Sequence, residues 1–463
     1  MDVERVEKQV RQGISLDSSA ACYPYSPRRP QVVWEITTMG KRPGYDWILG
    51  GTLPELGRHS VAKHEVFDRY IAAYIRTLTR NHLKRALNLT IVDGFCGGGR
   101  YVLEGMEVDG SPLRMLAAVE RAQAELDAAR VLGFEIKADF VFIDDNPNHV
   151  EFLRDQLHRR GHGARIDRDI RIITSTFEAA CPGVIERIQK KGRAHRSLFF
   201  LDQYGWSDVT FATIREIMGK LANPEVILTF MVDSLVNLLS DKMSDFRALT
   251  AIDYDRDDIR ALIALKQQKG WKRIIQNTVY GHIQAQTGAA FYTPFFIHPE
   301  KSNRDYWLLH LSKHHQAREE MGKIHWGLEN TFEHFGRTGF NALGFIPGVD
   351  VCEDVLDFGF NDNARSRSEA AVLDQLPRLI HAAAIRDDAP LTKQAIFASR
   401  CNDTPVVGDI VDSQLAFLRD EKEIVITAAD GSVRRSAKQF AWDDRIQRVR
   451  DPGLFSMLRL DAA

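Results

Sequence analysis

The chain has 463 residues and a mass of 52.5 kDa, so we expect two or three domains, because a single hydrophobic core stops growing near roughly 250 to 300 residues. A hydrophobic content of 44%, a charged content of 27% and a formal net charge of -2 are those of an ordinary soluble protein. This balance excludes a globally basic surface, so any nucleic-acid contact must be local.

The cysteine pattern and the apolar runs bear on the compartment. No two cysteines form a C-x-x-C pair; the five are Cys22, Cys96, Cys181, Cys352 and Cys401. This scatter predicts neither a disulfide framework nor a cysteine-rich zinc site. No apolar run reaches the ~18 residues of a membrane span, and the charged first residues do not resemble a signal peptide. We therefore expect a cytoplasmic protein.

The N-terminal part divides into an irregular segment and a helix. Residues 1–30 end in "CYPYSPRRP", where three prolines forbid regular structure, so we predict an extended segment outside the fold. From Gly57 to Leu87 the apolar residues are spaced as in an amphipathic helix, with Ser60 as a candidate N-cap.

Strand-like and helical patterns then alternate. The strand-like runs are "LTIVDGF", "DFVFIDDN", "IRIITST", "SLFFLDQYG" and "EVILTFMVDSL", and a helical pattern lies between each pair. Buried parallel strands read as continuous apolar runs, and the helices between them supply right-handed crossovers. The sequence therefore predicts a doubly wound, mostly parallel α/β sheet.

The rest of the chain completes this domain and adds another. We predict a helical insertion at about 240–285, followed by an antiparallel terminal hairpin of "AAFYTPFFIH" and "RDYWLLHLS", so that the α/β domain spans 31–328. Residues 329–389 read as a linker with a helix near Val372 to Ala384. In 390–463, two helices precede two short strands around the turn "ADG", which predicts a winged helix-turn-helix-like domain.

A glycine-rich loop follows the first strand of the sheet. The sequence "DGFCGGGRY" does not have the G-x-G-x-x-G spacing of a dinucleotide-binding loop. It fits the D-x-F-x-G-x-G pattern of class I S-adenosylmethionine (SAM) methyltransferases, with Asp93, Phe95, Gly97 and Gly99 at the patterned positions. These residues are therefore candidates for cofactor binding. The alternative is a purely structural tight turn.

The second strand ends in "FIDDN". A carboxylate here can accept both ribose hydroxyls of an adenosine moiety, so Asp144 and Asp145 are candidate cofactor-binding residues, with Asp145 favoured. The alternative is a solvated helix cap. The distance from Gly99 to Asp144 exceeds the usual ~20 residues, which implies an insertion at "YVLEGMEVDGSP".

The fourth strand ends in "FFLDQYGW". Amino-methylating nucleic-acid methyltransferases carry Asp/Asn-Pro-Pro-aromatic at this place, where the polar group holds the target amine and the ring stacks on the extruded base. Asp202 and Tyr204 are the candidate catalytic residues, and Gln203 replaces the first proline. Gln203 and Trp206 are candidate substrate-binding residues. The alternative is an aromatic side chain that packs on the core.

A basic face precedes the sheet. His59 and Lys63 lie four residues apart on one helical face and are candidates for substrate or anion binding, with a solvated face as the alternative. No set of three or four ligands predicts a metal. The stretches "LHRRGHGARIDRDIR" and "KKGRAHR" could follow a phosphate backbone, and the C-terminal domain could add duplex contacts.

Five ordered motifs give a family resemblance. The segments "RHSVAKHEVFDRYIAAYI", "IVDGFCGGGRY", "DGSPL", "FVFIDDN" and "FFLDQYGW" resemble the three-Cys-motif partner protein (TcmP) family over roughly residues 30 to 320. The resemblance implies a class I methyltransferase-like fold and pairing with a separate three-Cys-motif, radical-SAM-like protein. The chain departs from the family at Ser60, Cys96, Gly98 and Gln203, where the family has Thr, Ala, Pro and Pro.

Two function hypotheses follow. The first is a SAM-dependent methyltransferase that acts on DNA or RNA, with phage defence as a candidate setting. The second is a catalytically weak or inactive partner protein that uses the same fold to bind or regulate a three-Cys-motif protein. The glycine spacing disfavours a dinucleotide oxidoreductase, and the lack of clustered carboxylates disfavours a nuclease. Gln203 disfavours amino-methylation.

Overall fold

A computed structural model gives the structure of the protein. It describes residues 45–130, 133–205, 207–231, 249–267, 271–297, 306–328, 332–334, 358–359, 362–385 and 391–449, together with Leu235 and Leu239. The predicted N-terminal segment 1–30 lies outside the described residues.

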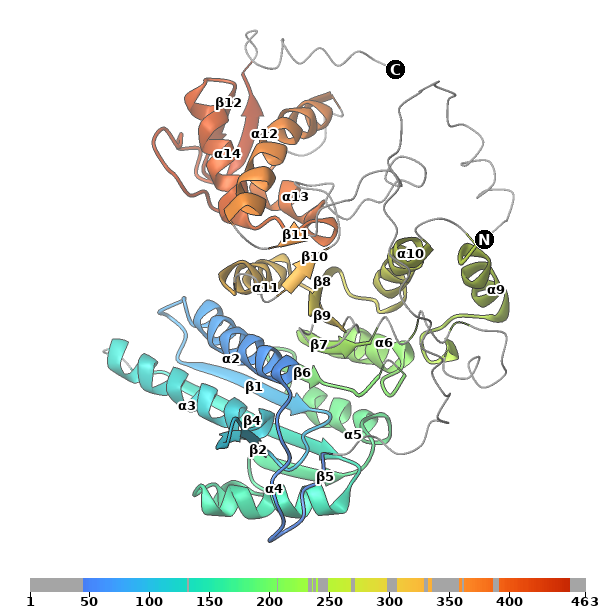
Figure 1. The fold of residues 1–463 in the computed structure, drawn as a ribbon. Coiled ribbons are helices and arrows are strands. Elements are labelled where there is room, and N and C mark those ends of the chain that lie inside the picture. Colours follow the sequence, from blue (N-terminus) through green and yellow to red (C-terminus); the bar gives the residue numbers. More distant parts are fainter. Residues whose placement is uncertain are drawn as a thin grey trace. The chain divides into compact units, whose positions relative to one another are not determined.

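Within these residues, nine strands form one mixed sheet in the order β11-β10-β8-β9-β7-β6-β1-β4-β5 (Figure 1). The strands are β1 (Ala86–Asp93), β4 (Glu135–Asp144), β5 (Ile170–Thr174), β6 (Arg196–Leu201), β7 (Pro224–Phe230), β8 (Phe291–Ile297), β9 (Tyr306–Ser312), β10 (Phe332–His334) and β11 (Phe358–Gly359). Strands β5, β4, β1, β6 and β7 are parallel, and β9 and β8 continue the sheet as an antiparallel hairpin. The prediction of a mixed α/β fold with a mostly parallel central sheet is confirmed.

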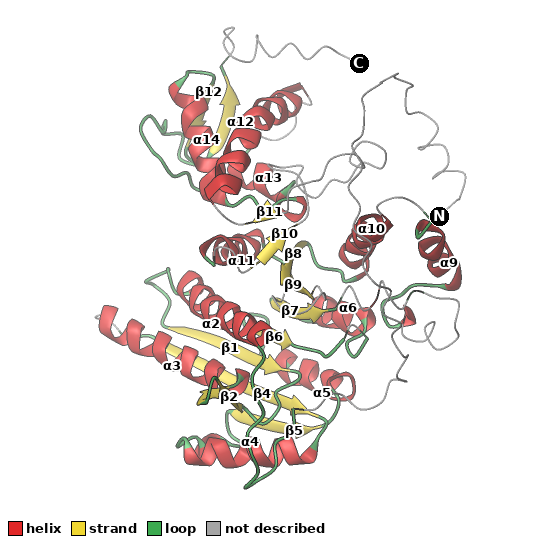
Figure 2. Ribbon diagram, in the orientation of Figure 1, coloured by secondary structure: helices red, strands yellow, loops and turns green. Residues whose placement is uncertain are grey.

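Helices cover both faces of the sheet (Figure 2). The helices of this part are α2 (Arg58–Leu78), α3 (Ser111–Ala129), α4 (Pro147–Arg159), α5 (Phe177–Gln189), α6 (Phe211–Lys220), α9 (Arg256–Leu265), α10 (Trp271–Gln286) and α11 (His315–Gly327), and among them α10 packs on α6 and α9 on α10. The buried apolar residues form two clusters. One includes residues of α2, α3, α4 and α11, and the other includes residues of α5, α6, α9 and α10. Neighbouring strand residues Ile91 and Val92 belong to different clusters, because side chains alternate across a sheet.

Three local predictions need correction. Helix α2 ends at Leu78, and Leu87 belongs to β1; its N-cap is Gly57, so Ser60 lies inside the helix and does not cap it. The region 329–389 is more than a linker, because β10 and β11 extend the sheet and the helix α12 (Asp362–Ile385) begins ten residues before Val372. Strands of two or three residues are too short to leave a periodic pattern.

The insertion after the glycine loop is a hairpin. Strands β2 (Arg100–Leu103) and β3 (Met106–Asp109) pair antiparallel in a small sheet of their own. The predicted helical insertion at 240–285 contains α9 and α10 among its described residues.

The C-terminal part contains α12, α13 (Lys393–Ala398), α14 (Gly408–Asp420), β12 (Ile424–Thr427) and β13 (Arg445–Arg448). Strands β12 and β13 are antiparallel, and Thr392 forms an isolated bridge with Arg445. The second strand was expected just after the turn "ADG", but only a single bridge, Thr427 to Val433, lies there. The partner of β12 comes from further along the chain, because hydrogen-bond pairing is decided by three-dimensional proximity.

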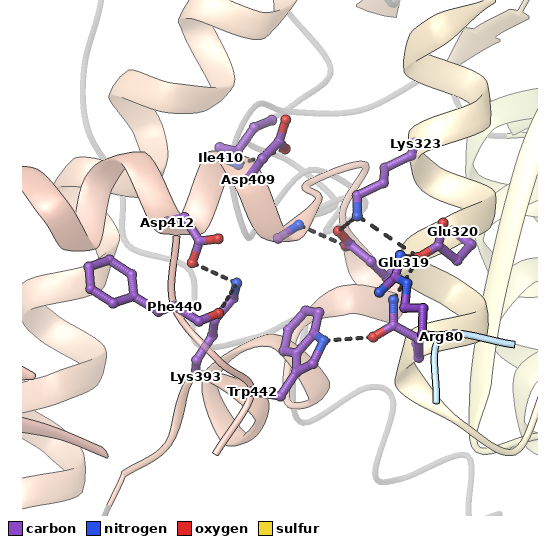
Figure 3. Close-up of polar contacts among 12 residues, drawn as sticks. Arg80, Glu319, Glu320, Lys323, Lys393, Asp409, Ile410, Asp412, Phe440 and Trp442 are labelled. Atoms are coloured by element: carbon purple, nitrogen blue, oxygen red, sulfur yellow. Dashed lines mark hydrogen bonds and ion pairs between the residues drawn. The ribbon is translucent and has the colours of Figure 1, made fainter. Parts of the chain in front are cut away.

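Buried polar contacts join this C-terminal part to α11 (Figure 3). Glu319 of α11 accepts a hydrogen bond of 2.7 Å from the backbone N–H of Gly408 at the start of α14, and its other oxygen lies 2.9 Å from the Lys323 ammonium. Within the C-terminal part, Lys393 pairs with Asp412 at 2.6 Å. A carboxylate at a helix N-terminus satisfies unpaired N–H groups and interacts favourably with the helix dipole.

A search of the described helices finds none with both the length and the apolar character that a bilayer crossing requires.

The Glu319 contact predicts a measurable loss of stability. Glu319→Ala leaves the buried Gly408 N–H without its charged acceptor, and we expect the free energy of unfolding to fall by about 2 kcal/mol. Chemical denaturation checks this. Glu65→Ala removes an exposed ion pair with Arg69 and is the control, with an expected change within about 0.5 kcal/mol. Equal effects of the two variants would contradict the assignment.

Candidate functional site

The glycine loop lies where the carboxyl ends of three parallel strands meet. Gly94 donates its N–H to the carbonyl of Phe200 at the end of β6 (2.9 Å), and Cys96 donates to the carbonyl of Ile143 at the end of β4 (3.0 Å). The loop after β1 is therefore tied to both neighbouring strands. The connections diverge here to opposite sides of β1, which in open α/β sheets is the position of ligand sites.

Two glycines of this loop adopt backbone conformations that other residues rarely take. Gly97 has a φ of 56° and Gly99 a φ of 77°. A Cβ on Gly99 would also lie 2.9 Å from the Leu153 side chain. The loop therefore requires glycine at both positions for its close packing.

Asp144 connects the end of β4 to the loop. Its Oδ2 accepts a hydrogen bond from the Gly97 N–H (3.0 Å), and its Oδ1 accepts from the Asn146 N–H (2.9 Å) and lies 3.0 Å from His149 Nδ1. The neighbouring Asp145 is exposed. The structure thus brings Asp144 to the glycine loop, while the favoured Asp145 is exposed.

Asp93 ends β1 and is buried. Burial raises the pKa of its carboxyl, with a smaller contribution from the charges of Asp202 and Asp144. Hydrogen bonds from Ser111 and the Phe95 backbone oppose the rise, and the net pKa is about 7. Its Oδ1 accepts the Phe95 N–H at 3.2 Å. The Phe95 side chain is half-buried and lies beside Phe177 with ring centroids 6.3 Å apart. Asp93 therefore shapes the loop from inside.

Lys63 and Asp202 form an ion pair that joins α2 to the end of β6. The Lys63 ammonium lies 2.6 Å and 2.7 Å from the two carboxylate oxygens, and the Lys63 side chain is buried. Burial alone would raise the pKa of Asp202, but the Lys63 charge and hydrogen bonds lower it below its usual value. Asp202 is therefore held as a carboxylate, and both its oxygens already have a cationic partner.

His64, the next residue of α2, lies in the same charged environment. Burial, Arg114 and Lys63 lower its pKa to about 3, and the opposite influence of Asp202 does not compensate. Its imidazole is therefore neutral near pH 7. Among the described residues its Nδ1 has no hydrogen-bond partner, and its ring lies 6.2 Å from that of Tyr101.

The remaining predicted residues differ in their placement. Gln203 is buried, and its side-chain oxygen accepts the Val209 N–H at 3.0 Å, so it holds the turn after β6. Tyr204 is 53% exposed and does not pack on the core. Trp206 lies outside the described residues, and so does the side chain of His59.

Trp47 lies on the glycine loop and was not singled out from the sequence. A Cβ on Gly98 would lie 2.2 Å from Trp47 Cγ, and one on Gly97 would lie 2.7 Å from its Cη2. The Trp47 ring also meets His149 edge-on at 4.8 Å. The segment "GYDWILGG" carries no periodic or motif signal, and about fifty residues separate it from the loop, so the sequence could not indicate this contact.

Among the described residues, no group of three or more His, Cys, Asp or Glu side chains is placed to hold a metal ion.

No family model matches the chain. No curated protein matches it. Solved structures give weak similarities. The protein LPL1258 from Legionella pneumophila str. Philadelphia 1 is 11% identical, with a TM-score of 0.31, over 56% of this chain and 85% of that one. A SAM-dependent methyltransferase from Agrobacterium tumefaciens is 10% identical, with a TM-score of 0.28, over 56% and 63%.

The plantazolicin methyltransferase BamL, in complex with a triazolic desmethylPZN analogue and SAH, is 6% identical, with a TM-score of 0.25, over 56% of this chain and 89% of that one. Scores this low do not carry a functional argument.

The raised pKa of Asp93 predicts a pH effect on stability. The Asp93 carboxyl has a pKa of about 3.9 in the unfolded chain and about 7 in the folded protein. Between these two pH values the unfolded chain binds fewer protons than the folded protein, so the free energy of unfolding falls as pH rises. Asp93→Asn removes this dependence. The free energy of unfolding of the variant, minus that of the natural protein, should rise by on the order of 4 kcal/mol from pH 4 to pH 8, as measured by chemical denaturation. Parallel pH profiles would contradict the burial argument.

The Lys63 pair predicts a second stability effect. Lys63→Met leaves the Asp202 carboxylate without its cation, and we expect a loss of about 3 kcal/mol. Lys63→Met with Asp202→Leu should recover most of it, because no unpaired charge remains. Lys190→Met removes an exposed pair with Glu186 and is the control. Failure of the double variant to recover would show that other contacts of Asp202, such as its contact with Thr229, and not the unpaired charge, account for the loss.

Proposed function

We propose that the protein is a SAM-dependent methyltransferase whose cofactor binds at the glycine loop between β1 and β4. The observation that carries this proposal is the direct hydrogen bond from the Gly97 N–H to the Asp144 carboxylate. It puts a carboxylate that can accept ribose hydroxyls beside a loop whose glycines let a ligand come close to the backbone. The loop lacks the spacing of a dinucleotide site.

The residues present fit such a cofactor. Asp144 offers carboxylate oxygens to ribose hydroxyls, and the Gly97 and Gly99 backbone permits close approach of a ligand. Bound SAM would supply an activated methyl group. Asp93 supports the loop by accepting the Phe95 N–H, and it is buried like the glycines of the loop.

The acceptor side of the site is formed by Asp202, Lys63 and Tyr204. Lys63 holds Asp202 ionised and in one orientation. A fixed Asp202 can in turn orient the acceptor group, and alignment of the acceptor supplies much of the rate of a group transfer. Exposed Tyr204 next to Asp202 offers a ring on which a planar group can stack, which supports a nucleobase as the acceptor. DNA or RNA is thus the proposed substrate class.

Gln203 does not exclude this function. Its side chain bonds to the Val209 backbone, so it stabilises the turn that a proline would stiffen in the related motif. The exchange therefore affects loop rigidity more directly than acceptor chemistry.

A second candidate, the partner-protein role, is favoured by the surface of α14. This helix exposes Asp409, Phe417 and Asp420, but Asp409 pairs with Arg365 and Asp420 with Arg419, and exposed Glu421 and Lys422 follow the helix. The exposed Phe417 offers an apolar contact on a face without unpaired charge, which suits a protein partner better than a phosphate backbone. The TcmP resemblance offers a three-Cys-motif, radical-SAM-like protein as that partner, with the cytoplasm and phage defence as the proposed setting.

The predicted basic stretches are also largely neutralised. Arg160 pairs with Asp109 at 2.6 Å, and Arg165 pairs with Glu120 and Asp169. A nucleic acid would have to compete with these carboxylates, so we propose that substrate contacts concentrate near Tyr204 and not on these stretches.

Calorimetric titration with SAM, NAD and ATP tests the cofactor. We expect SAM to bind and NAD not to bind, and Asp144→Ala should weaken SAM binding at least about tenfold, because charge-assisted hydrogen bonds are lost. Asp145→Ala should have the smaller effect. Asp155→Ala, an α4 residue paired with Arg159, is the control. Binding of NAD alone would overturn the proposal.

Transfer of labelled methyl groups to DNA, RNA and protein pools tests the reaction. Asp202→Ala should abolish transfer while SAM binding remains. Tight SAM binding without transfer to any pool would favour the partner-protein role.

A further inference from the structure

The glycine loop is covered in this structure. Gly97, Gly98 and Gly99 are buried, and so are Asp93 and Cys96 on the same loop. The Asp144 side chain is 10% exposed. A ligand of this loop must touch backbone that solvent does not reach, so a covering group has to move before the ligand binds.

The covering group is Trp47, which is 3% exposed. Its indole lies directly on Gly97 and Gly98, because a Cβ on either glycine would collide with it. Its Nε1 donates a hydrogen bond of 2.5 Å to the carbonyl of Arg100, just after the loop. Its ring meets Tyr101 at 5.1 Å and His149 at 4.8 Å. Trp47 thus contacts the glycines of the loop, the residues that follow them and the histidine that holds Asp144.

The segment that carries Trp47 is attached mainly at its ends. We call residues 45–56 the strap; it is the dark blue stretch before α2 in Figure 1. Near its C-terminal end, Leu56 donates to the Val102 carbonyl (2.7 Å) and Val102 donates to the Pro54 carbonyl (2.9 Å). At its other end, the Tyr45 hydroxyl accepts the Gly57 N–H at 3.3 Å.

Between these attachments the strap is held by Trp47 and by Asp46, whose carboxylate lies 3.6 Å from His149 Nε2, while residues 48–51 have few buried contacts. Ile48 and Leu49 are exposed, and Gly50 has a φ of 77° in a turn closed by the Gly51 N–H to the Ile48 carbonyl. Segments with few buried contacts open at low free-energy cost. The two glycines form a natural hinge beside a tryptophan that is held by one hydrogen bond and ring contacts.

We propose that the strap covers the ligand site and that Trp47 acts as a gate. Trp47 must leave Gly97 and Gly98 before an adenosyl ligand enters. This inference rests on the proposed function. When Trp47 leaves, His149 loses a ring contact, and the Asp144 group that it holds becomes accessible. The apparent affinity for the ligand is then the affinity of the open form multiplied by the fraction of molecules that are open.

Trp47 as a fixed wall of an open site is the competing interpretation, and it makes the opposite prediction. A wall stabilises a bound ligand, so its removal weakens binding. A gate competes with the ligand, so its removal strengthens binding and speeds association.

Titration with SAM and rapid-mixing kinetics on the full chain separate the two. Trp47→Ala should bind SAM about tenfold more tightly, mainly through faster association. Trp47→Phe keeps an aromatic ring but loses the hydrogen bond to Arg100, so it should give an intermediate gain and guards against misfolding of the alanine variant. Trp442→Phe, in the C-terminal part, is the control and should bind as the natural protein does.

Hydrogen exchange of the peptide covering residues 94–101 gives a readout without ligand. In the free protein this peptide should be protected, Trp47→Ala should raise its exchange, and SAM should restore protection. Equal or weaker SAM binding by folded Trp47 variants would overturn the gate but not the proposed function. Absence of SAM binding by every variant would overturn both.

Discussion

The site depends on two backbone hydrogen bonds that tie the loop after β1 to the ends of β6 and β4. They hold the loop across the carboxyl edge of the sheet, where the strand connections diverge. Because Gly97 and Gly99 adopt positive φ angles, the loop can turn sharply enough to bring the Gly97 N–H to Asp144. Every other feature of the site is placed relative to this loop.

Charges in the site are buried but compensated. Lys63 of α2 and Asp202 after β6 neutralise each other. Burial raises the pKa of Asp93, which favours its neutral form. Isolated charges at such positions would be costly, because desolvation penalises the ionised form. The sheet edge therefore combines a fixed carboxylate at Asp202, a neutral imidazole at His64 and a carboxyl at Asp93 that titrates near neutrality.

Periodicity predicted the central elements well. The apolar runs around Ile91, Phe142 and Phe199 became adjacent buried strands, because long runs of this kind are stable only inside a covered sheet. The short strands β10 and β11 and the true partner of β12 were missed, because pairing of a few residues depends on which segments meet in space. Residue type and position also predicted that the loop glycines and Asp202 follow the ends of strands, which is where they lie.

The sequence by itself determined the alternation of strands and helices, the glycine-rich turn and the acidic residues at the strand ends, because these follow from local patterns. Only the tertiary structure decided that Asp144 faces the loop while Asp145 is exposed, that Lys63 pairs with Asp202, and that Trp47 covers the glycines. The physical reason is the same in each case. Side-chain direction at a strand end, and contacts between segments fifty or more residues apart, are decided by packing and not by local sequence.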